Sequence, residues 1–186
     1  MMKVRNPGIV THIEVDENKK FKFLFVALGV AIRPFSVMQK VIGLDGMFFK
    51  STCKGTLLIA TCQDVNFHCY SITCGVVDIE RDESWNWFLA KLKDVIGEPN
   101  GLVFISDRHG SIQKVVANVF PIALYGACVW HLEINLKNKF KNKSVISIFN
   151  KAVRAYKILE FIAKFSKLER RFPHVHKFLV DVSVER

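Results

Sequence analysis

The sequence lacks an apolar run long enough to cross a bilayer. Its apolar segment 23–32 has ten residues, whereas a membrane-spanning helix needs about 20. The segment follows three lysines, as the core of a signal peptide would, but it begins deep in the chain and after acidic residues. We therefore predict that it is a β-strand, and we expect no membrane partner.

The sequence also lacks a Cys-x-x-Cys pair, an internal repeat and any low-complexity segment. Its five cysteines are an odd number, and four of them lie in or beside apolar, strand-like runs, where a free cysteine behaves as a small hydrophobic residue. This usage favours a reducing, intracellular setting. Half of the residues are hydrophobic, which is typical of a globular chain and not of a disordered one.

The positive charge is unevenly distributed. The net charge is +10, but residues 137–186 contain 13 Lys and Arg against 4 Asp and Glu, so almost all of the excess belongs to the last quarter of the chain. Such a local excess attracts a polyanion, with nucleic acid the first candidate, although a solvated helix face is the alternative. The best candidates for contacts with a DNA backbone are Lys137, Lys139, Lys141 and Lys143, and a solvated loop explains them about equally well.

Two short apolar runs end in an aspartate. Residues 41–44 lead to Asp45, and residues 102–106 lead to Asp107. Runs of this length bounded by Gly or Pro predict buried strands. Because carboxylates at such positions are usually paired, hydrogen-bonded or bound to a cation, two of them suggest a shared metal. The alternative is that both are ordinary loop or cap residues.

The order of predicted elements indicates an α/β fold. A hairpin at 7–30 precedes three strands joined by short turns, which predict an antiparallel meander. Then follow a helix, a strand, a helix and a strand, and the pattern after Cys128 is helical. This is the element order of a ribonuclease-H-like fold, with a mixed five-stranded sheet of three antiparallel strands and then parallel additions, flanking helices and a C-terminal helical insertion. The expected strands are 41–49, 56–62, 69–77, 102–106 and 122–127, and the expected helices are 85–96, 112–119, 129–140 and one from 145 through 165.

Several stretches resemble one known family, in order and with its spacing. The chain is similar, over nearly its whole length, to the transposase domain of plant Mutator-like elements (MULEs). The matching stretches are Asn6-Pro-Gly8, Leu24-Phe-Val26, Val41-Ile-Gly-Leu-Asp-Gly-Met-Phe-Phe-Lys50, Gly55-Thr-Leu-Leu-Ile-Ala60, Gly75-Val-Val-Asp-Ile-Glu80, Ser84-Trp-Asn-Trp-Phe88, Phe104-Ile-Ser-Asp-Arg-His109, Cys128-Val-Trp-His131 and Phe172-Pro173.

The resemblance implies a catalytic core that uses an Asp-Asp-Glu set and Mg²⁺ (or Mn²⁺) to cut and join double-stranded DNA at transposon ends, in the nucleus. Asp45 and Asp107 match the family's first two carboxylates and are the expected catalytic and metal-binding residues. No glutamate has the sequence context of the third, so the chain is expected to bind metal poorly, and whether it is an enzyme is left open. The glutamates considered and set aside are Glu133, Glu160, Glu169 and Glu185.

Other positions match the family or depart from it. Cys128 and His131 match its Cys-x-x-His signature, for which a structural or DNA-proximal role is favoured over a zinc site, because two ligands do not make one. Arg108 and His109 are expected near DNA phosphates, although a loop histidine is often merely solvated. Tyr125 stands where related sequences commonly have histidine.

These observations predict three parts: a hairpin lead-in at 1–40, an incomplete transposase core at 41–136 and a basic helical insertion, truncated, at 137–186. The leading hypothesis is a fragment of a transposase catalytic domain. The alternatives are a domesticated derivative that binds DNA or regulates transcription, and an inactive transposon remnant. Formation of a homo-oligomer is left open.

Overall fold

The computed structural model describes residues 6–50, 54–107 and 110–183. The chain divides into two compact units, Met1–Gly126 and Ala127–Arg186, and each unit is described by itself. The boundary predicted at residue 136 falls inside a helix, and the functional division at 40 and 136 stays a prediction. Among the described residues, no helix has both the length and the apolar character needed to cross a membrane.

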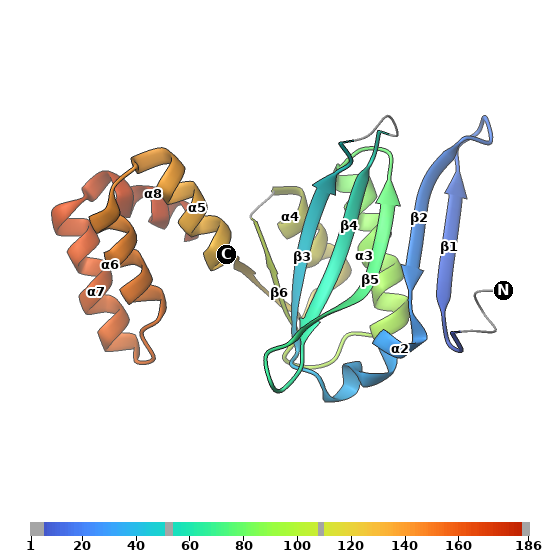
Figure 1. The fold of residues 1–186 in the computed structure, drawn as a ribbon, viewed down its shortest axis with the longest axis horizontal. Helices are drawn as coiled ribbons and strands as arrows, with labels where there is room; N and C mark the ends of the chain where they lie inside the picture. The colour runs from blue at the N-terminus through green and yellow to red at the C-terminus, as the bar shows by residue number, and fades with distance from the viewer. Residues whose placement is uncertain (1–5, 51–53, 108–109, 184–186) are drawn as a thin grey trace. The chain divides into compact units, whose positions relative to one another are not determined.

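The first unit is built on a mixed sheet of seven strands in the order β1-β2-β5-β4-β3-β6-β7 (Figure 1). As predicted, β3, β4 and β5 form an antiparallel meander, and β6 pairs with β3 in parallel. The predicted count of five strands was too low, because the N-terminal hairpin joins the same sheet. The strands are β1 Val10–Val15, β2 Phe21–Ala27, β3 Val41–Phe48, β4 Thr56–Gln63, β5 Cys69–Val77, β6 Val103–Ser106 and β7 Leu124–Ala127.

The hairpin belongs to the sheet because β2 can bury one of its faces. Its register against β5 runs from Phe23 opposite Val77 to Ala27 opposite Thr73. Phe23 and Phe25 are almost fully buried, so leaving the hairpin detached would expose two aromatic side chains.

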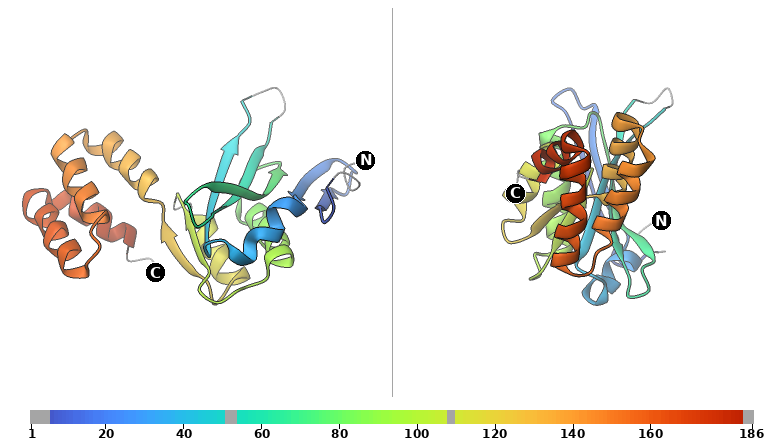
Figure 2. Two further views of the ribbon diagram at one scale, coloured as in Figure 1. Left: turned by 60° about the horizontal axis from the view of Figure 1, so that its bottom comes forward. Right: turned by 90° about the vertical axis from the view of Figure 1, so that its left-hand side faces the viewer.

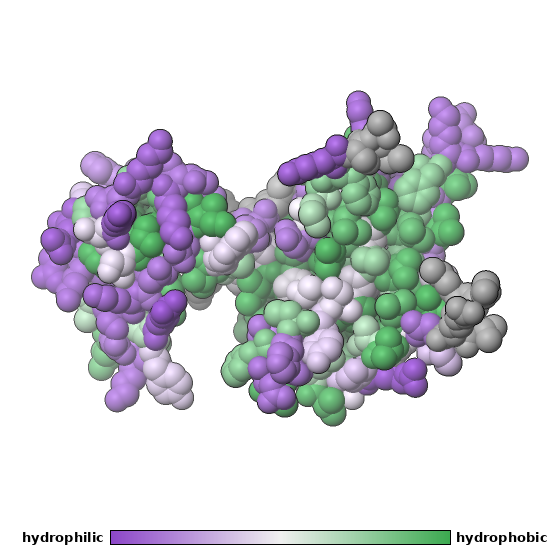
Figure 3. All heavy atoms as spheres, viewed as in Figure 1, coloured by the Kyte–Doolittle hydropathy of each residue, from purple (hydrophilic) through white to green (hydrophobic). Residues whose placement is uncertain are grey.

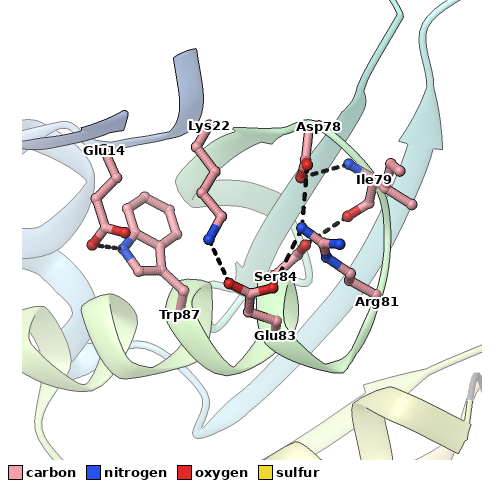
Figure 4. Close-up of polar contacts among 8 residues, drawn as sticks. All are labelled: Glu14, Lys22, Asp78, Ile79, Arg81, Glu83, Ser84 and Trp87. Carbon is pink, nitrogen blue, oxygen red and sulfur yellow. Dashed lines mark hydrogen bonds and ion pairs between the residues drawn. The ribbon is translucent and has the colours of Figure 1, made fainter. Parts of the chain in front are cut away.

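Polar contacts also connect the hairpin with helix α3, Asp82–Ile96 (Figure 4). Lys22 Nζ donates to Glu83 Oε1 at 2.5 Å, and Trp87 Nε1 donates to Glu14 Oε1. Arg81 bridges Glu83 to Asp78 at the end of β5. These contacts connect β1, β2 and β5 with the first two turns of one helix.

Helix α3 and helix α4, Gly110–Val119, cover one face of the sheet (Figures 1 and 2). The predicted helix 85–96 is confirmed, and it begins three residues earlier than the apolar pattern. Trp85, Phe88 and Leu89 are fully buried, as their i, i+3, i+4 spacing predicts. Two short helices, α2 Gly29–Ile32 and η1 Arg33–Val37, connect β2 with β3.

The opposite face of the sheet is apolar and half-buried. Residues alternate between half-buried and buried positions along β4 and along β2 after its exposed first residue, Phe21. Figure 3 shows hydrophobic side chains gathered over β3, β4 and β5. Near-continuous apolar strands are typical of sheets with side chains packed on both faces. Half-buried apolar residues on this face include Leu24, Val26, Leu57, Ile59 and Val76.

The second unit is helical, and the face of it that Figure 3 shows is mainly hydrophilic. It contains α5 Val129–Phe140, α6 Lys143–Val153, α7 Ile158–Arg171 and α8 Pro173–Ser183. The helix predicted from 145 through 165 is in fact two helices, because the chain leaves the helical path between 154 and 157. Helix α7 ends at Arg171, and Pro173 opens α8, where a proline at the first position costs no hydrogen bond. The core of this unit is formed by Leu136, Val145, Phe149, Leu168, Val175 and Leu179.

Candidate functional site: two acids at the end of the parallel strand pair

The parallel pair β3–β6 determines where the two candidate acids lie. Val41 is opposite Val103 and Gly43 is opposite Ile105. Asp45 and Asp107 each follow two residues later, so continuation of this register sets the two acids opposite each other. Neighbouring strands are about 4.8 Å apart. The strand pairing expected from the sequence therefore exists, and it brings both acids to the same end of the sheet.

Buried neighbours hold each acid in an exposed position. On β3, Ile42 and Leu44 are buried in the core, whereas Asp45 is exposed. On β6, Phe104 and Ser106 are buried, and Asp107 follows as an exposed residue. Asp45 Oδ1 accepts a hydrogen bond from the Gly46 amide at 2.9 Å. Both residues are therefore exposed, Asp45 within β3 and Asp107 directly after β6.

Tyr125 contacts the residue that precedes Asp107. Its hydroxyl group shares a hydrogen bond with the hydroxyl of Ser106, which is 1% exposed. The sequence marked Tyr125 only as a departure from the family pattern. Sequence reasoning missed its contact because β6 and β7 are adjacent in the sheet but are separated by α4 in the chain.

Glu80 is a third acid near this end of the sheet, but it has a structural partner. Its Oε1 accepts a hydrogen bond from the buried Trp85 Nε1 at 3.1 Å, and its carboxylate lies against Gly46. Among the described residues there is no group of three or more His, Cys, Asp or Glu suited to hold a metal. Asp45 and Asp107 thus stand as a pair in the part of the chain that the structure describes.

The pair fits one divalent cation better than two. Mg²⁺ is commonly held by one or two carboxylates, with waters and phosphate oxygens completing its octahedral shell. Two metal ions flanking a phosphate need further ligands, and the carboxylate of Glu80 is already engaged by Trp85. The donor set is therefore suitable for a single, weakly held ion.

Cys128 and His131 lie at the start of α5. Cys128 is the N-cap residue and makes no side-chain capping hydrogen bond, and both residues are half-buried. His131 Nδ1 is buried without a hydrogen-bond partner in the described structure, and the His131 ring packs edge-on against Trp130, with ring centroids 4.8 Å apart. Neither residue belongs to a larger group of potential ligands among the residues described.

The four candidate lysines do not lie in one place. Lys137, Lys141 and Lys143 line an open pocket of about 360 Å³ at the junction of α5 and α6, together with Asn142, Ile146, Ser147 and Asn150. Lys139 points elsewhere: its Nζ lies 4.3 Å from the centre of the Phe178 ring. The structure thus separates three pocket lysines from one that packs on an aromatic side chain.

The positive charge of the pocket lysines is only partly neutralised. Lys137 Nζ lies 2.7 Å from Glu133 Oε1, and this hydrogen bond, with a second from Asn150, lowers the pKa of Glu133 below its ordinary value. Lys141 and Lys143 have no acidic partner among the described residues. The pocket therefore keeps a positive charge that an anion could neutralise. Arg108 and His109, the other expected DNA contacts, lie outside the described residues.

The fold and the acid pair define a mixed α/β protein with two carboxylates at the end of neighbouring parallel strands. A family model described as the MULE transposase domain matches residues 41–135. The match covers β3 through most of α5 and just over half of the chain, so the chain belongs to the MULE transposase domain family and is related to transposases. No curated protein matches the chain.

Proposed function

We propose that the chain is the catalytic-core portion of a Mutator-like transposase with ribonuclease-H-like topology, and that its substrate is double-stranded DNA at transposon ends in the nucleus. The parallel β3–β6 register supports this most strongly, because it gives Asp45 and Asp107 corresponding positions on adjacent strands. The family match includes both residues. The order β5-β4-β3-β6-β7 agrees with the proposed topology.

In this proposal Asp45 and Asp107 would hold one Mg²⁺ or Mn²⁺ ion. Such an ion, when bound, neutralises charge on the phosphate and makes a bound water more acidic. The role of the two aspartates would be to bind and orient the ion. The buried side chains beside them keep the strands in place. An Asp-Asp-Glu site requires one more carboxylate, so we expect this chain alone to bind metal weakly and to cut DNA poorly or not at all.

A second candidate function is DNA binding without cleavage, as in a domesticated derivative that regulates transcription. The pocket lysines support it, because Lys141 and Lys143 present positive charge with no acidic partner in the described structure. Lysines that neutralise phosphates release counterions, so such binding weakens steeply as salt rises. The two candidate functions differ in one respect: a transposase core needs Asp45 and Asp107 for its activity, whereas a DNA-binding protein does not.

The test combines metal binding with cleavage. Mn²⁺ binding is measured by electron paramagnetic resonance for the chain and for Asp45→Asn, Asp107→Asn and Asp94→Asn variants, and each is also assayed for nicking of a labelled duplex. Asp94 is an exposed acid on α3 whose nearest cation is Lys91 at 3.8 Å, so its variant is the matched control. We expect Mn²⁺ affinity to fall at least tenfold in the first two variants and to stay unchanged in the control.

The outcomes separate the candidates. Nicking that both site variants abolish would mean that a glutamate within this chain completes the site. Salt-sensitive DNA binding with no nicking and no Mn²⁺ binding in any variant would support the DNA-binding candidate. Equal Mn²⁺ affinity in all four proteins would contradict the proposed metal site.

A further inference from the structure

Strand β1 forms one edge of the seven-stranded sheet (Figure 1). It pairs with β2 from Val10 opposite Ala27 to Val15 opposite Phe21. No other strand of the described residues lies along its outer side. An edge strand presents unpaired N–H and C=O groups and can therefore accept a further strand.

The sequence of β1 does little to prevent such pairing. Edge strands are usually protected by lysine, proline or a bulge. Residues 10–15 contain neither lysine nor proline, and the register shifts only near the end, between Glu14 and Val15. Ile13 is 69% exposed and Val15 is 55% exposed. Two β-branched apolar side chains at an open edge favour pairing over solvation.

The side chains of β1 are self-complementary around Ile13. If two copies pair in antiparallel fashion about a two-fold axis at Ile13, His12 of one copy is opposite the partner's Glu14, and the reverse pair is equivalent. Ile13 is then opposite the same residue of the partner, and Thr11 is opposite the partner's Val15. An imidazole that can hydrogen-bond to an opposed carboxylate, and β-branched residues in directly opposed positions, stabilise antiparallel pairs.

His12 and Glu14 are on the same side of the sheet as α3, and this side has room for the pairing. The His12 ring lies 6.1 Å from the Phe25 ring, and Glu14 accepts a hydrogen bond from Trp87 of α3 (Figure 4). Helix α3 packs on β2 and β5. Since β1 lies beyond β2, the helices of two paired copies would be separated by β1 and β2 of both, which leaves more than the 8–10 Å that packed helices need.

We propose that β1 is the site at which a second copy of this chain binds, antiparallel and centred on Ile13, so that the two sheets become continuous. The inference is independent of the metal site, because β1 lies at the opposite edge of the sheet from β6 and β7. A residue-centred axis gives the same opposed pairs whether Ile13 is at a hydrogen-bonded or a non-hydrogen-bonded position.

Sedimentation of the whole chain over a range of concentrations tests the interface. We expect a monomer–dimer equilibrium whose dissociation constant rises at least tenfold in Ile13→Lys, because a charge would be opposed to its own copy. Val65→Lys is the matched control, since Val65 is 72% exposed in the β4–β5 turn and lies away from β1. Circular dichroism confirms that each variant is folded. A monomer at every concentration, or a dimer that Ile13→Lys leaves unchanged, would overturn the proposal.

A charge exchange tests the register. His12→Glu alone should weaken the dimer, because two acids would then be opposed, and His12→Glu combined with Glu14→Lys should restore it. Directly opposed residues in antiparallel strands lie within disulfide reach. Because Cys69 is free and exposed, Ile13→Cys is combined with Cys69→Ser, and the pair should give a covalent dimer on oxidation that Cys69→Ser alone does not give. Failure of both the restoration and the cross-link would exclude the antiparallel arrangement centred on Ile13.

Discussion

Glu80 occupies the space that a side chain at residue 46 would fill. A Cβ atom built on Gly46 lies 3.0 Å from each carboxylate oxygen of Glu80, and Trp85 Nε1 fixes one of these oxygens. Trp85 is fully buried, so the carboxylate cannot move without breaking this hydrogen bond. A glycine at the position after Asp45 is therefore explained by an acid just before α3 that packs against its backbone.

The first prediction is that Gly46→Ala destabilises the protein by about 1 to 2 kcal/mol, because the methyl group displaces Glu80 from Trp85. Gly126→Ala is the matched control, since a Cβ there meets nothing within 4 Å. Urea unfolding measures the free energy of unfolding of both variants. Equal stability of the two variants would show that Glu80 moves aside without cost.

The second prediction concerns the hydroxyl of Tyr125. Tyr125→Phe removes its hydrogen bond with Ser106 and should cost about 1 kcal/mol of unfolding free energy. Mn²⁺ affinity should also fall, since Asp107 follows Ser106 directly. Tyr156→Phe is the control, because Tyr156 is 98% exposed and its substitution should change neither quantity. A Tyr125→Phe variant that matches the parent chain in both measurements would contradict the role of this contact.

The third prediction is a pH dependence that arises from Glu98. Lys93 Nζ donates to Glu98 Oε2 at 2.6 Å, and the Ile122 amide donates to Oε1 at 3.0 Å. These hydrogen bonds, that from Lys93 above all, lower the pKa of Glu98 in the folded chain. Its stabilisation is therefore complete above the unfolded-state pKa, about 4.3, and is lost as pH falls through the lower folded-state value.

Urea unfolding between pH 3 and 7 checks this dependence. Glu98→Gln should flatten the acid limb of the stability curve, whereas Glu17→Gln, in the exposed β1–β2 turn, should leave it unchanged. The same acid limb in the Glu98→Gln variant and in the parent chain would assign the dependence to other groups.

The fourth prediction separates the lysines. Lys141→Gln combined with Lys143→Gln should reduce the slope of log affinity for duplex DNA against log salt by about 2, since each phosphate contact contributes about 0.9. Lys139→Gln should leave that slope unchanged and instead lower stability by about 0.5 to 1 kcal/mol through the lost contact with Phe178. Fluorescence anisotropy at several salt concentrations measures the slope. An equal effect of Lys139→Gln would show that the pocket does not select among the lysines.

Local patterns in the sequence predicted most elements of the fold. The apolar run at 56–62 and the i, i+3, i+4 spacing of Trp85, Phe88 and Leu89 each identify an element correctly. Periodicity describes one element at a time, however, and the joining of the hairpin to β5 depends on a pairing between distant segments. The break before α7 was missed for a similar reason, since apolar spacing continues across residues 154–157 although the backbone does not.

The candidate site was predictable only in part. The two acids could be found because each ends a recognisable apolar run. The partner of Tyr125 and the ring under Lys139 could not be found, since both depend on which side chains meet after elements far apart in sequence have packed. The resemblance to a family identified Tyr125 as unusual but gave no information on its contact.

The two candidate acids meet only through a pairing that closes a long loop. Val41 and Val103 are partners in the sheet although 62 positions separate them in the chain, and closing such a loop costs entropy before any contact compensates for it. Parallel pairs of this kind form slowly, after local hairpins and helices. An ion that requires both acids cannot bind the unfolded chain in the same way, so it stabilises the folded one by mass action. A rise of the melting temperature with Mn²⁺ concentration would therefore report the pairing of β3 with β6, independently of any reaction on DNA.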